Sequence, residues 1–286
     1  MDKHTKAVEE VTKTFGTSYY FATRFLPPDL RKATYALYSF FRIPDEIVDN
    51  SISHKKDTIL YELEEWESIW ISAYSGEQTK YPTLNMTAEV FHKYNIPYQY
   101  SIDFLRAMKQ DVHINRYKTY EDLRQYMYGS AVVVGLMMTF VIGYNNKKAL
   151  EYASCLGEAM QLTNFIRDIG EDYRDRGRIY LPQEDMEEYG VSESILANNI
   201  INPAFKDLIQ FEIQRARMLY RKSDRGVKYL NKRGQFAVIM ASRMYEAILD
   251  KVEQNEYDVL NKRARTSKRE KIYILGKAAF EYGFQG

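Results

Sequence analysis

Apolar residues recur along this chain at steps of three and four, which is the period of an amphipathic α-helix. Alternating apolar and polar residues, which would predict β-strands, are scarce. Proline, glycine and asparagine mark the breaks between the periodic segments. The pattern predicts helices over residues 28–42, 56–74, 87–94, 97–112, 119–140, 147–174, 205–223, 225–254 and 267–284.

No segment is long enough, or low enough in complexity, to act as a linker between domains. The chain has 286 residues, enough to bury a sizeable core as one domain. We therefore expect residues 1–286 to form a single all-α domain, a helical bundle around a central cavity.

The longest apolar run extends from Ala131 to Ile142 and contains Gly135. It is shorter than the roughly 20 residues that a membrane-spanning helix needs, so it predicts a buried helix. Residues 1–15 are charged and lack the apolar run of a signal peptide. We expect a cytoplasmic protein, for which loose contact with a membrane through exposed aromatic residues stays open.

Charge and cysteine content narrow the function classes. The 40 Lys and Arg residues nearly balance the 39 Asp and Glu residues, so no net field favours nucleic acid, and no such partner is expected. The single cysteine, Cys155, excludes a disulfide within the chain and lies in an apolar helical pattern. We interpret Cys155 as a small core residue.

Two acidic motifs share the spacing D-x-x-x-D: Asp45 with Asp49, and Asp168 with Asp172. On a helix, this spacing places both carboxylates of a pair on one face. Like charges so placed destabilise a helix slightly, so two matched pairs suggest a ligand that neutralises them. Oxygen ligands without cysteine or clustered histidine favour a hard cation such as Mg²⁺, with Mn²⁺ as a substitute.

The second motif belongs to a longer polar stripe, and arginines accompany both motifs. The stripe runs at helical steps through Gln161, Asn164, Asp168, Asp172 and Asp175. Basic residues beside metal-binding carboxylates are what a diphosphate would need. The plainer alternative is local ion pairing on a solvated surface, which contributes only tenths of a kcal/mol. The arginines are Arg42, Arg167, Arg174, Arg176 and Arg178.

Pro44 precedes the first motif directly. A proline inside a helix removes one hydrogen bond and favours a kink. The sequence therefore predicts that Asp45 and Asp49 follow a bend or occupy the first turn of a new helix, where acidic residues also serve as caps.

These motifs occur in an order that resembles the squalene and phytoene synthases, over about residues 15–252. Within that family, the D-E-I-V-D and R-I-Y-L-P runs are most similar to phytoene synthases. The matching segments are Asp45 to Asp49, Asp111, Arg116 to Leu123, Tyr126 to Gly135, Gln161 to Asp172 and Arg178 to Pro182.

The resemblance implies an all-α prenyl-synthase fold in which the two aspartate motifs face each other across a cavity and hold Mg²⁺. It assigns metal binding to Asp45, Asp49, Asp168, Asp172 and Asn164, and catalysis to the four aspartates with Tyr126. For substrate diphosphate binding, the residues that it implies are Ser18, Arg42, Gln161, Asn164, Arg178 and Tyr245. The chain departs from many relatives at Gly16, Thr17 and Pro44, which leaves the details of one diphosphate pocket open.

The reaction implied is the head-to-head condensation of two geranylgeranyl diphosphates to phytoene through a cyclopropylcarbinyl diphosphate, in carotenoid biosynthesis. NADPH is not expected for this product. The open alternatives are dehydrosqualene or squalene synthesis from farnesyl diphosphate, and a noncatalytic assembly or binding protein of the same fold. A di-iron bundle is disfavoured because His4, His54, His92 and His113 provide no Glu-x-x-His pair. Substrate length and oligomeric state do not follow from the sequence.

Overall fold

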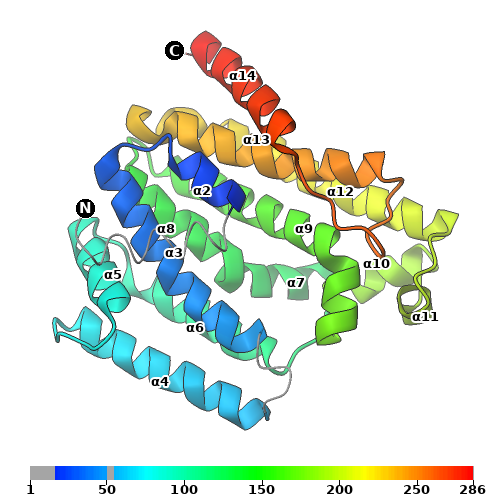
Figure 1. The fold of residues 1–286 in the computed structure, drawn as a ribbon, viewed down its shortest axis with the longest axis horizontal. Helices are drawn as coiled ribbons and strands as arrows, with labels where there is room; N and C mark the ends of the chain where they lie inside the picture. The colour runs from blue at the N-terminus through cyan, green and yellow to red at the C-terminus, as the bar shows by residue number, and fades with distance from the viewer. Residues whose placement is uncertain (1–16, 50–54, 286) are drawn as a thin grey trace.

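The computed structural model describes residues 17–49 and 55–285, and the described residues form helices with no β-strand. One isolated antiparallel bridge joins Tyr144 to Leu230. The predicted all-α class is confirmed (Figure 1). The elements are α2 (Thr17–Thr23), α3 (Pro28–Asp49), α4 (Lys56–Tyr74), α5 (Pro82–Lys93), α6 (Tyr98–Asp111), α7 (Tyr120–Met127), the π-helical turn η1 (Tyr128–Val132), α8 (Val133–Ile142), α9 (Lys148–Arg176), α10 (Gln183–Glu188), α11 (Glu193–Ala197), α12 (Pro203–Asp224), the 3₁₀ turn η2 (Val227–Tyr229), α13 (Lys232–Gln254) and α14 (Lys268–Gln285).

Helix α9 is the central element of the bundle. It packs against α12, α13, α8 and η1, while α3 packs against α5, α6 and α8 on the other side of the fold (Figure 1). Aromatic residues fill the packing between α3, α4, α5 and α6, where the ring of Phe40 lies 4.8 Å from that of Trp70. Trp70 is fully buried, and its indole N–H donates to Ser101 Oγ at 2.9 Å, so the polar atom of this large side chain is satisfied.

Most predicted helices are present, but some boundaries differ. The prediction that one helix covers 225–254 is wrong, because the chain turns through η2 before α13 begins at Lys232. The Asn231 side chain caps α13 by accepting from the Arg233 N–H. Helix α5 begins at Pro82 instead of Thr87, since proline fits the first turn. The short helices α2, α10 and α11 were not predicted.

The predicted helix 119–140 extends to Ile142 and contains the π-helical turn η1. Thr119 begins it with a capping box to Asp122. In η1, a Cβ on Gly129 would lie 2.6 Å from the carbonyl oxygen of Asp103, so glycine allows α6 to approach closely. The run Tyr120–Ile142 has 23 residues and is long and apolar enough to cross a membrane, but 56% of its most apolar window is buried. We interpret it as a core helix, as predicted.

Pro44 does not start a new helix, so the alternative that Asp45 and Asp49 occupy a first helical turn is wrong. Helix α3 continues through Pro44 to Asp49, and Pro44 is buried. The first aspartate pair therefore lies at the carboxyl end of α3 instead of at an amino-terminal turn. This position changes its electrostatics, because the helix dipole disfavours an anion there.

Glu212 is a buried acid on α12, away from the cavity, and it belongs to an ion-pair cluster between α10 and α12. Glu212 on α12 accepts from Arg215 at 2.8 Å, and Arg215 also donates to Asp185 on α10 at 2.7 Å. Burial, which is the largest cause, and the neighbouring Asp185 raise the pKa of Glu212 to about 8 against the opposing effect of Arg215. Arg215 also lies over the Tyr120 ring, at 4.0 Å from its centroid.

We expect Glu212→Gln to retain stability at neutral pH and to change its pH dependence. The folded pKa of Glu212 lies above its unfolded value, so its contribution is complete below the unfolded pKa and is lost as pH rises through about 8. Chemical denaturation at pH 6 and pH 9 should show that the parent loses more stability than the Gln variant. An equal loss in both proteins would contradict this, because it would show that Glu212 is already ionised at pH 6.

Candidate functional site

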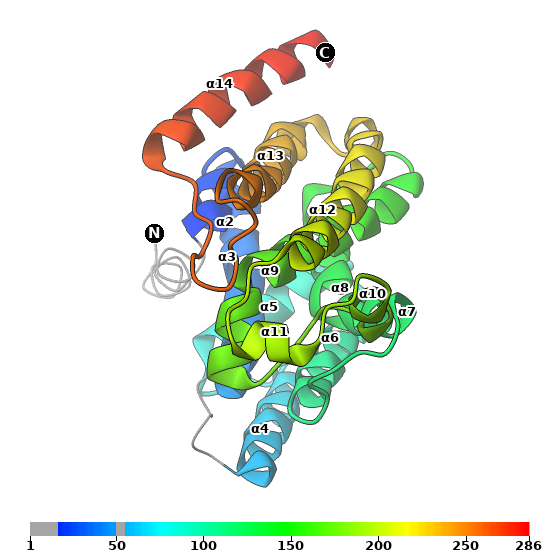
Figure 2. The same cartoon turned by 90° about the vertical axis from the view of Figure 1, so that its right-hand side faces the viewer.

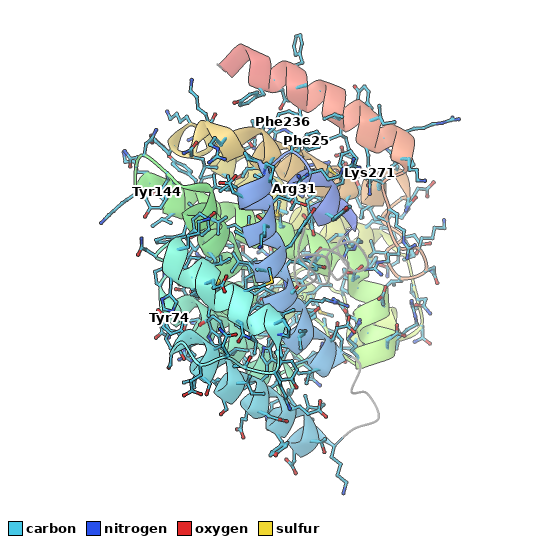
Figure 3. The ribbon with its side chains drawn as sticks, turned by 60° about the vertical axis from the view of Figure 1, so that its left-hand side comes forward. Phe25, Arg31, Tyr74, Tyr144, Phe236 and Lys271 are labelled. Atoms are coloured by element: carbon cyan, nitrogen blue, oxygen red, sulfur yellow. The ribbon has the colours of Figure 1, made fainter. Side chains whose placement is uncertain are left out.

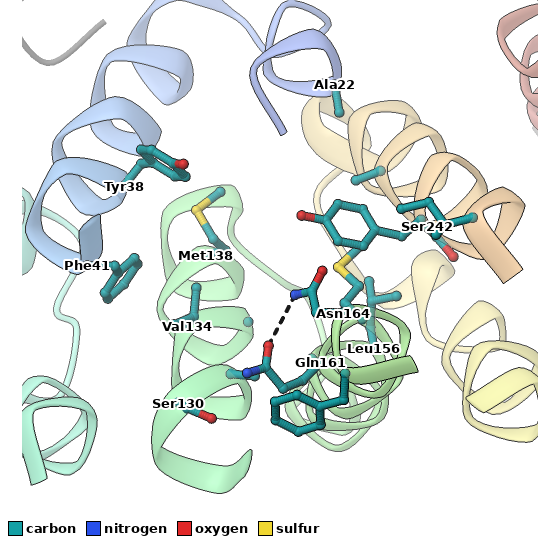
Figure 4. Close-up of a pocket in the computed structure, with 18 of the residues that line it drawn as sticks. Ala22, Tyr38, Phe41, Ser130, Val134, Met138, Leu156, Gln161, Asn164 and Ser242 are labelled. Atoms are coloured by element: carbon teal, nitrogen blue, oxygen red, sulfur yellow. Dashed lines mark hydrogen bonds between the residues drawn. The ribbon is translucent and has the colours of Figure 1, made fainter. Parts of the chain in front are cut away.

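A cavity of about 900 Å³ opens between α3, α8, α9 and α13. This volume lies at the upper end of the range typical of small-molecule sites, roughly 300–1,000 Å³. Figure 4 shows Tyr38 and Phe41 from α3 facing Met138 and Val134 from α8, with side chains of α9 and α13 closing the other side. One part of the wall is apolar, and the other carries charged groups.

All four aspartates of the two motifs line this cavity. Asp45 and Asp49 lie in the last turns of α3, and Asp168 and Asp172 lie near the end of α9, which ends at Arg176. Both pairs therefore lie near helix carboxyl ends, where the partial negative charge of the helix favours cations. The two motifs face one common space, as the family resemblance implies.

Arginines contact the first motif closely. Arg42 donates to Asp45 at 2.5 Å and also pairs with Glu46. Asp49 Oδ1 lies 3.1 Å from a nitrogen of Arg176 and 3.1 Å from a nitrogen of Arg178. The carboxylates of this motif are therefore already partly neutralised by the protein.

The second motif receives arginines from its own helix and from a distant segment. Arg167 donates to Asp168 at 2.5 Å, and Arg263 reaches Asp168 at 3.0 Å. The segment that carries Arg263 can approach because position 170 is glycine: a Cβ there would lie 2.4 Å from the Leu260 carbonyl oxygen. The glycine inside D-I-G-E-D thus allows a third element to reach the site.

Arg176 joins the two motifs. Its guanidinium lies 3.1 Å from Asp49 of the first motif and 3.1 Å from Asp172 of the second. Its Nε is buried and has no acceptor in hydrogen-bond geometry among the described residues, so the contact with Asp49 is an ion pair without a well-formed hydrogen bond. Both aspartate pairs therefore have arginine partners within the protein.

Carboxylates outnumber guanidinium groups at the site, and two of the carboxyl groups have raised pKa values. Burial first, and then the neighbouring Asp49, raise the pKa of Asp45 to about 6. Burial and Asp168 raise the pKa of Asp172 to about 7, and Asp49 across the cavity contributes in the same direction. In the ion-paired network, the guanidinium groups of Arg42, Arg167, Arg176, Arg178 and Arg263 face the more numerous carboxylates of Asp45, Glu46, Asp49, Asp111, Asp168, Glu171 and Asp172.

Asp111 at the end of α6 connects this network to a stack of aromatic rings. Its carboxylate accepts from the Tyr180 hydroxyl at 2.9 Å and pairs with Arg178 at 3.1 Å. The Tyr180 ring stacks on Phe165 at 4.2 Å between centroids, and on Tyr126 at 5.8 Å. Burial raises the pKa of Tyr126 well above its usual value, so this hydroxyl keeps its proton.

The remaining predicted residues lie in different places. Gln161, Asn164 and Tyr245 line the cavity, and Asn164 donates to Gln161 at 3.2 Å (Figure 4). Asp175 ends the predicted polar stripe but is exposed and does not line the main cavity. Ser18 lies on α2, and its side chain is outside the described residues. Cys155 is buried, as predicted.

The sequence reasoning gave no role to several residues at the site, among them Arg263 and Tyr180. Arg263 lies in a basic stretch outside the quoted motifs, and no local spacing relates it to Asp168. Tyr180 belongs to the R-I-Y-L-P run but received no role. Arg263 and Tyr180 could have been expected on chemical grounds. Buried or clustered carboxylates such as Asp168 and Asp111 need cationic or hydrogen-bonding partners.

We expect Arg176→Gln to destabilise the metal-free protein, because it leaves Asp49 and Asp172 with less compensation. The Arg176 side chain is partly exposed, so the expected loss is about 1–2 kcal/mol of unfolding free energy, below that for a fully buried pair. Denaturation in the presence of a chelator measures it. Arg174→Gln is the control, because Arg174 contacts a backbone carbonyl of Leu260 and no carboxylate of the motifs. Equal stability of parent and Arg176→Gln would contradict the bridging role.

Comparison with known proteins agrees with this geometry. Residues 12–270 match the family model described as squalene/phytoene synthase. A phytoene synthase from Arthrospira platensis is 33% identical over 279 residues, which cover 93% of this chain and 89% of that protein. A 15-cis-phytoene synthase from Synechocystis sp. is 34% identical over 280 residues, covering 93% of this chain and 81% of that protein.

A solved structure supports the same assignment. The crystal structure of a dehydrosqualene synthase in complex with ligand superimposes with a TM-score of 0.91 at 27% identity, covering 98% of this chain and 97% of that one. The match of the family model extends over most of the residues that build the cavity, from α2 to Arg263. The chain therefore belongs to the squalene/phytoene synthase family.

Proposed function

We propose that this protein is a prenyltransferase that joins two geranylgeranyl diphosphates head to head to form phytoene, in carotenoid biosynthesis. The observation that carries the proposal is the convergence of two aspartate pairs at the charged part of a cavity whose remaining wall is apolar. The phytoene synthases at 33–34% identity support the twenty-carbon substrate.

The donor set fits Mg²⁺, with Mn²⁺ as a substitute. The carboxylates of Asp45, Asp49, Asp168 and Asp172 and the amide oxygen of Asn164 are hard oxygen donors. Within residues 17–49 and 55–285, no three acidic, histidine or cysteine side chains lie close enough to share an ion. Arg176, which pairs with both motifs, would therefore move when a cation binds.

When bound, the divalent cation would supply Lewis-acid stabilisation of the departing diphosphate. The arginines of the chain would provide the rest of that stabilisation. Arg42 and Arg178 line the cavity beside the aspartates, and a planar guanidinium can bind phosphate oxygens in pairs. Gln161 and Tyr245, on the same cavity wall, would complete the diphosphate contacts.

The apolar wall would protect the allylic cation once diphosphate leaves. Val134 and Met138 from α8 and Leu156 and Met160 from α9 line the cavity. Side chains of this kind exclude water, which would otherwise quench the cation before the double bond of the second substrate reacts with it. Attack by that double bond, followed by loss of a proton as the cyclopropane ring closes, gives the cyclopropylcarbinyl diphosphate. This intermediate ionises again and loses a second proton to give phytoene.

We expect Tyr126→Phe to bind substrate normally but to make less hydrocarbon. The substitution keeps the ring in the stack with Tyr180 and removes the hydroxyl that interacts with Asp111. If that hydroxyl positions diphosphate or helps to move a proton, the cyclopropyl intermediate should accumulate. Product analysis by mass spectrometry checks this. Parent-like turnover and product ratio would make Tyr126 a packing residue.

The main alternative is dehydrosqualene or squalene synthesis from farnesyl diphosphate, which the dehydrosqualene synthase at 27% identity favours. Purified protein with Mg²⁺ should be given the fifteen- or the twenty-carbon diphosphate, with and without NADPH. We expect phytoene from the twenty-carbon substrate without NADPH. Turnover of only the fifteen-carbon substrate would indicate dehydrosqualene, and a product that requires NADPH would indicate squalene. No product from either substrate would favour a noncatalytic protein of the same fold.

We further propose a cytoplasmic location with peripheral membrane contact, because the hydrocarbon product is insoluble in water. No nucleic-acid partner is expected from the charge balance of 40 basic and 39 acidic residues. Sedimentation of the protein with and without membranes from the same cells tests the location.

A further inference from the structure

Helix α14 carries apolar side chains on both of its faces. The inner face packs on α13 through Ile274 and the fully buried Ala278. The outer face presents Ile272, Tyr273 and Phe280, which are 67%, 74% and 67% exposed. Large apolar residues gathered on one exposed face indicate an interaction surface rather than a core.

The charges of α14 are sorted between the same two faces. Its two acidic residues pair with α13: Glu270 with Lys251, and Glu281 with Arg243 at 3.0 Å. The exposed charges that remain on the helix are basic, at Lys268, Arg269 and Lys277. The outer surface of α14 therefore combines apolar and basic groups, a combination that suits the interface of an anionic lipid bilayer.

The helix also adjoins the cavity. Lys271, in the first turns of α14, lines the cavity together with Ala264, Arg265 and Thr266 from the preceding segment. Figure 3 shows Lys271 at the end of α14 that lies nearest the bundle. In Figure 2, α14 crosses the outside of the molecule beyond α13, where a flat surface could approach it. A membrane bound to α14 would lie beside a margin of the cavity.

We propose that the outer face of α14 docks on an anionic lipid bilayer, with Ile272, Tyr273 and Phe280 entering the headgroup region and Lys268, Arg269 and Lys277 pairing with lipid phosphates. Its use in releasing an apolar product rests on the proposed function, whereas the docking itself does not. Tyrosine suits this depth because its ring is apolar and its hydroxyl stays hydrated.

Sedimentation with phosphatidylcholine vesicles, with and without phosphatidylglycerol, tests the proposal in the absence of substrate. The parent should bind the vesicles that contain phosphatidylglycerol, and high salt should weaken this binding. Changing Lys268, Arg269 or Lys277 to Gln, one at a time, should lower the affinity for these vesicles roughly fivefold. The triple variant Ile272→Gln, Tyr273→Gln and Phe280→Gln should lower it by about tenfold or more.

A matched control is the double variant Ile200→Gln and Met218→Gln, which removes apolar side chains that are 44% and 57% exposed elsewhere on the surface. It should bind vesicles like the parent. Circular dichroism confirms that each variant is folded, and turnover in detergent should stay at the parent level. Parent-like binding by the triple variant, or equal binding to vesicles without phosphatidylglycerol, would overturn the proposal. A dimer that the triple variant abolishes would instead assign this face to a second copy of the chain.

Discussion

Asp45→Asn and Asp168→Asn are each expected to lower turnover by a factor of roughly 10³, equivalent to about 4 kcal/mol of activation free energy. Both substitutions keep the shape of the side chain and remove its charge. Because Asp45 and Asp168 line one cavity from opposite motifs, either change should weaken the same diphosphate-activating site. Steady-state kinetics with saturating Mg²⁺ measure the effect.

Asp175→Asn is the control for these variants. Asp175 lies on α9 three residues beyond Asp172, but it is exposed and lies outside the main cavity wall. It should retain nearly full turnover. Near-normal turnover in either Asp45→Asn or Asp168→Asn would refute the metal-site interpretation, and a comparable loss in Asp175→Asn would show that the effect is not specific to the cavity.

Arg178→Gln is expected to affect both stability and activity. The Arg178 side chain is only 10% exposed and pairs with Asp49 and Asp111, each at 3.1 Å. Removing one partner of a buried ion pair leaves uncompensated carboxylates, so we expect a loss of about 3 kcal/mol in unfolding free energy. Turnover should fall by about 10²-fold or more, since Arg178 also lines the cavity.

Arg178→Lys separates charge from geometry in this prediction. Lysine keeps the positive charge but cannot reach two carboxylates in the planar arrangement of a guanidinium, so it should restore stability more than turnover. Denaturation and kinetics on the same preparations give both quantities. If Arg178→Gln unfolds with the free energy of the parent, the network around Asp111 does not stabilise the fold.

The helical architecture could be predicted because apolar periodicity and breaking residues are local. The D-x-x-x-D spacing likewise indicated both carboxylate pairs correctly. Pro44 shows the limit of local rules, since it lies inside α3 and does not begin a new helix. The break before α13 was missed because residues 225–231 retain an apolar pattern while their backbone turns.

The ion-pair network could not be predicted, because its partners are remote in sequence. Arg178 meets Asp111 across 67 residues, and Arg263 meets Asp168 across 95. Charge and composition show only that such residues exist. Their pairing depends on the close approach at Gly170 and on the aromatic stack that fixes Tyr180. These features appear only once the helices are packed.

The most direct test of the head-to-head condensation uses geranylgeranyl diphosphate carrying two deuterium atoms on its first carbon. Two such substrates bring four deuterium atoms to the new bond. One deuteron is lost when the cyclopropane ring closes, and a second is lost when the central double bond forms. With Mg²⁺ and no NADPH, mass spectrometry should detect a forty-carbon hydrocarbon that retains two deuterium atoms. A product that retains three or four deuterium atoms, or no forty-carbon hydrocarbon at all, would contradict the proposed reaction.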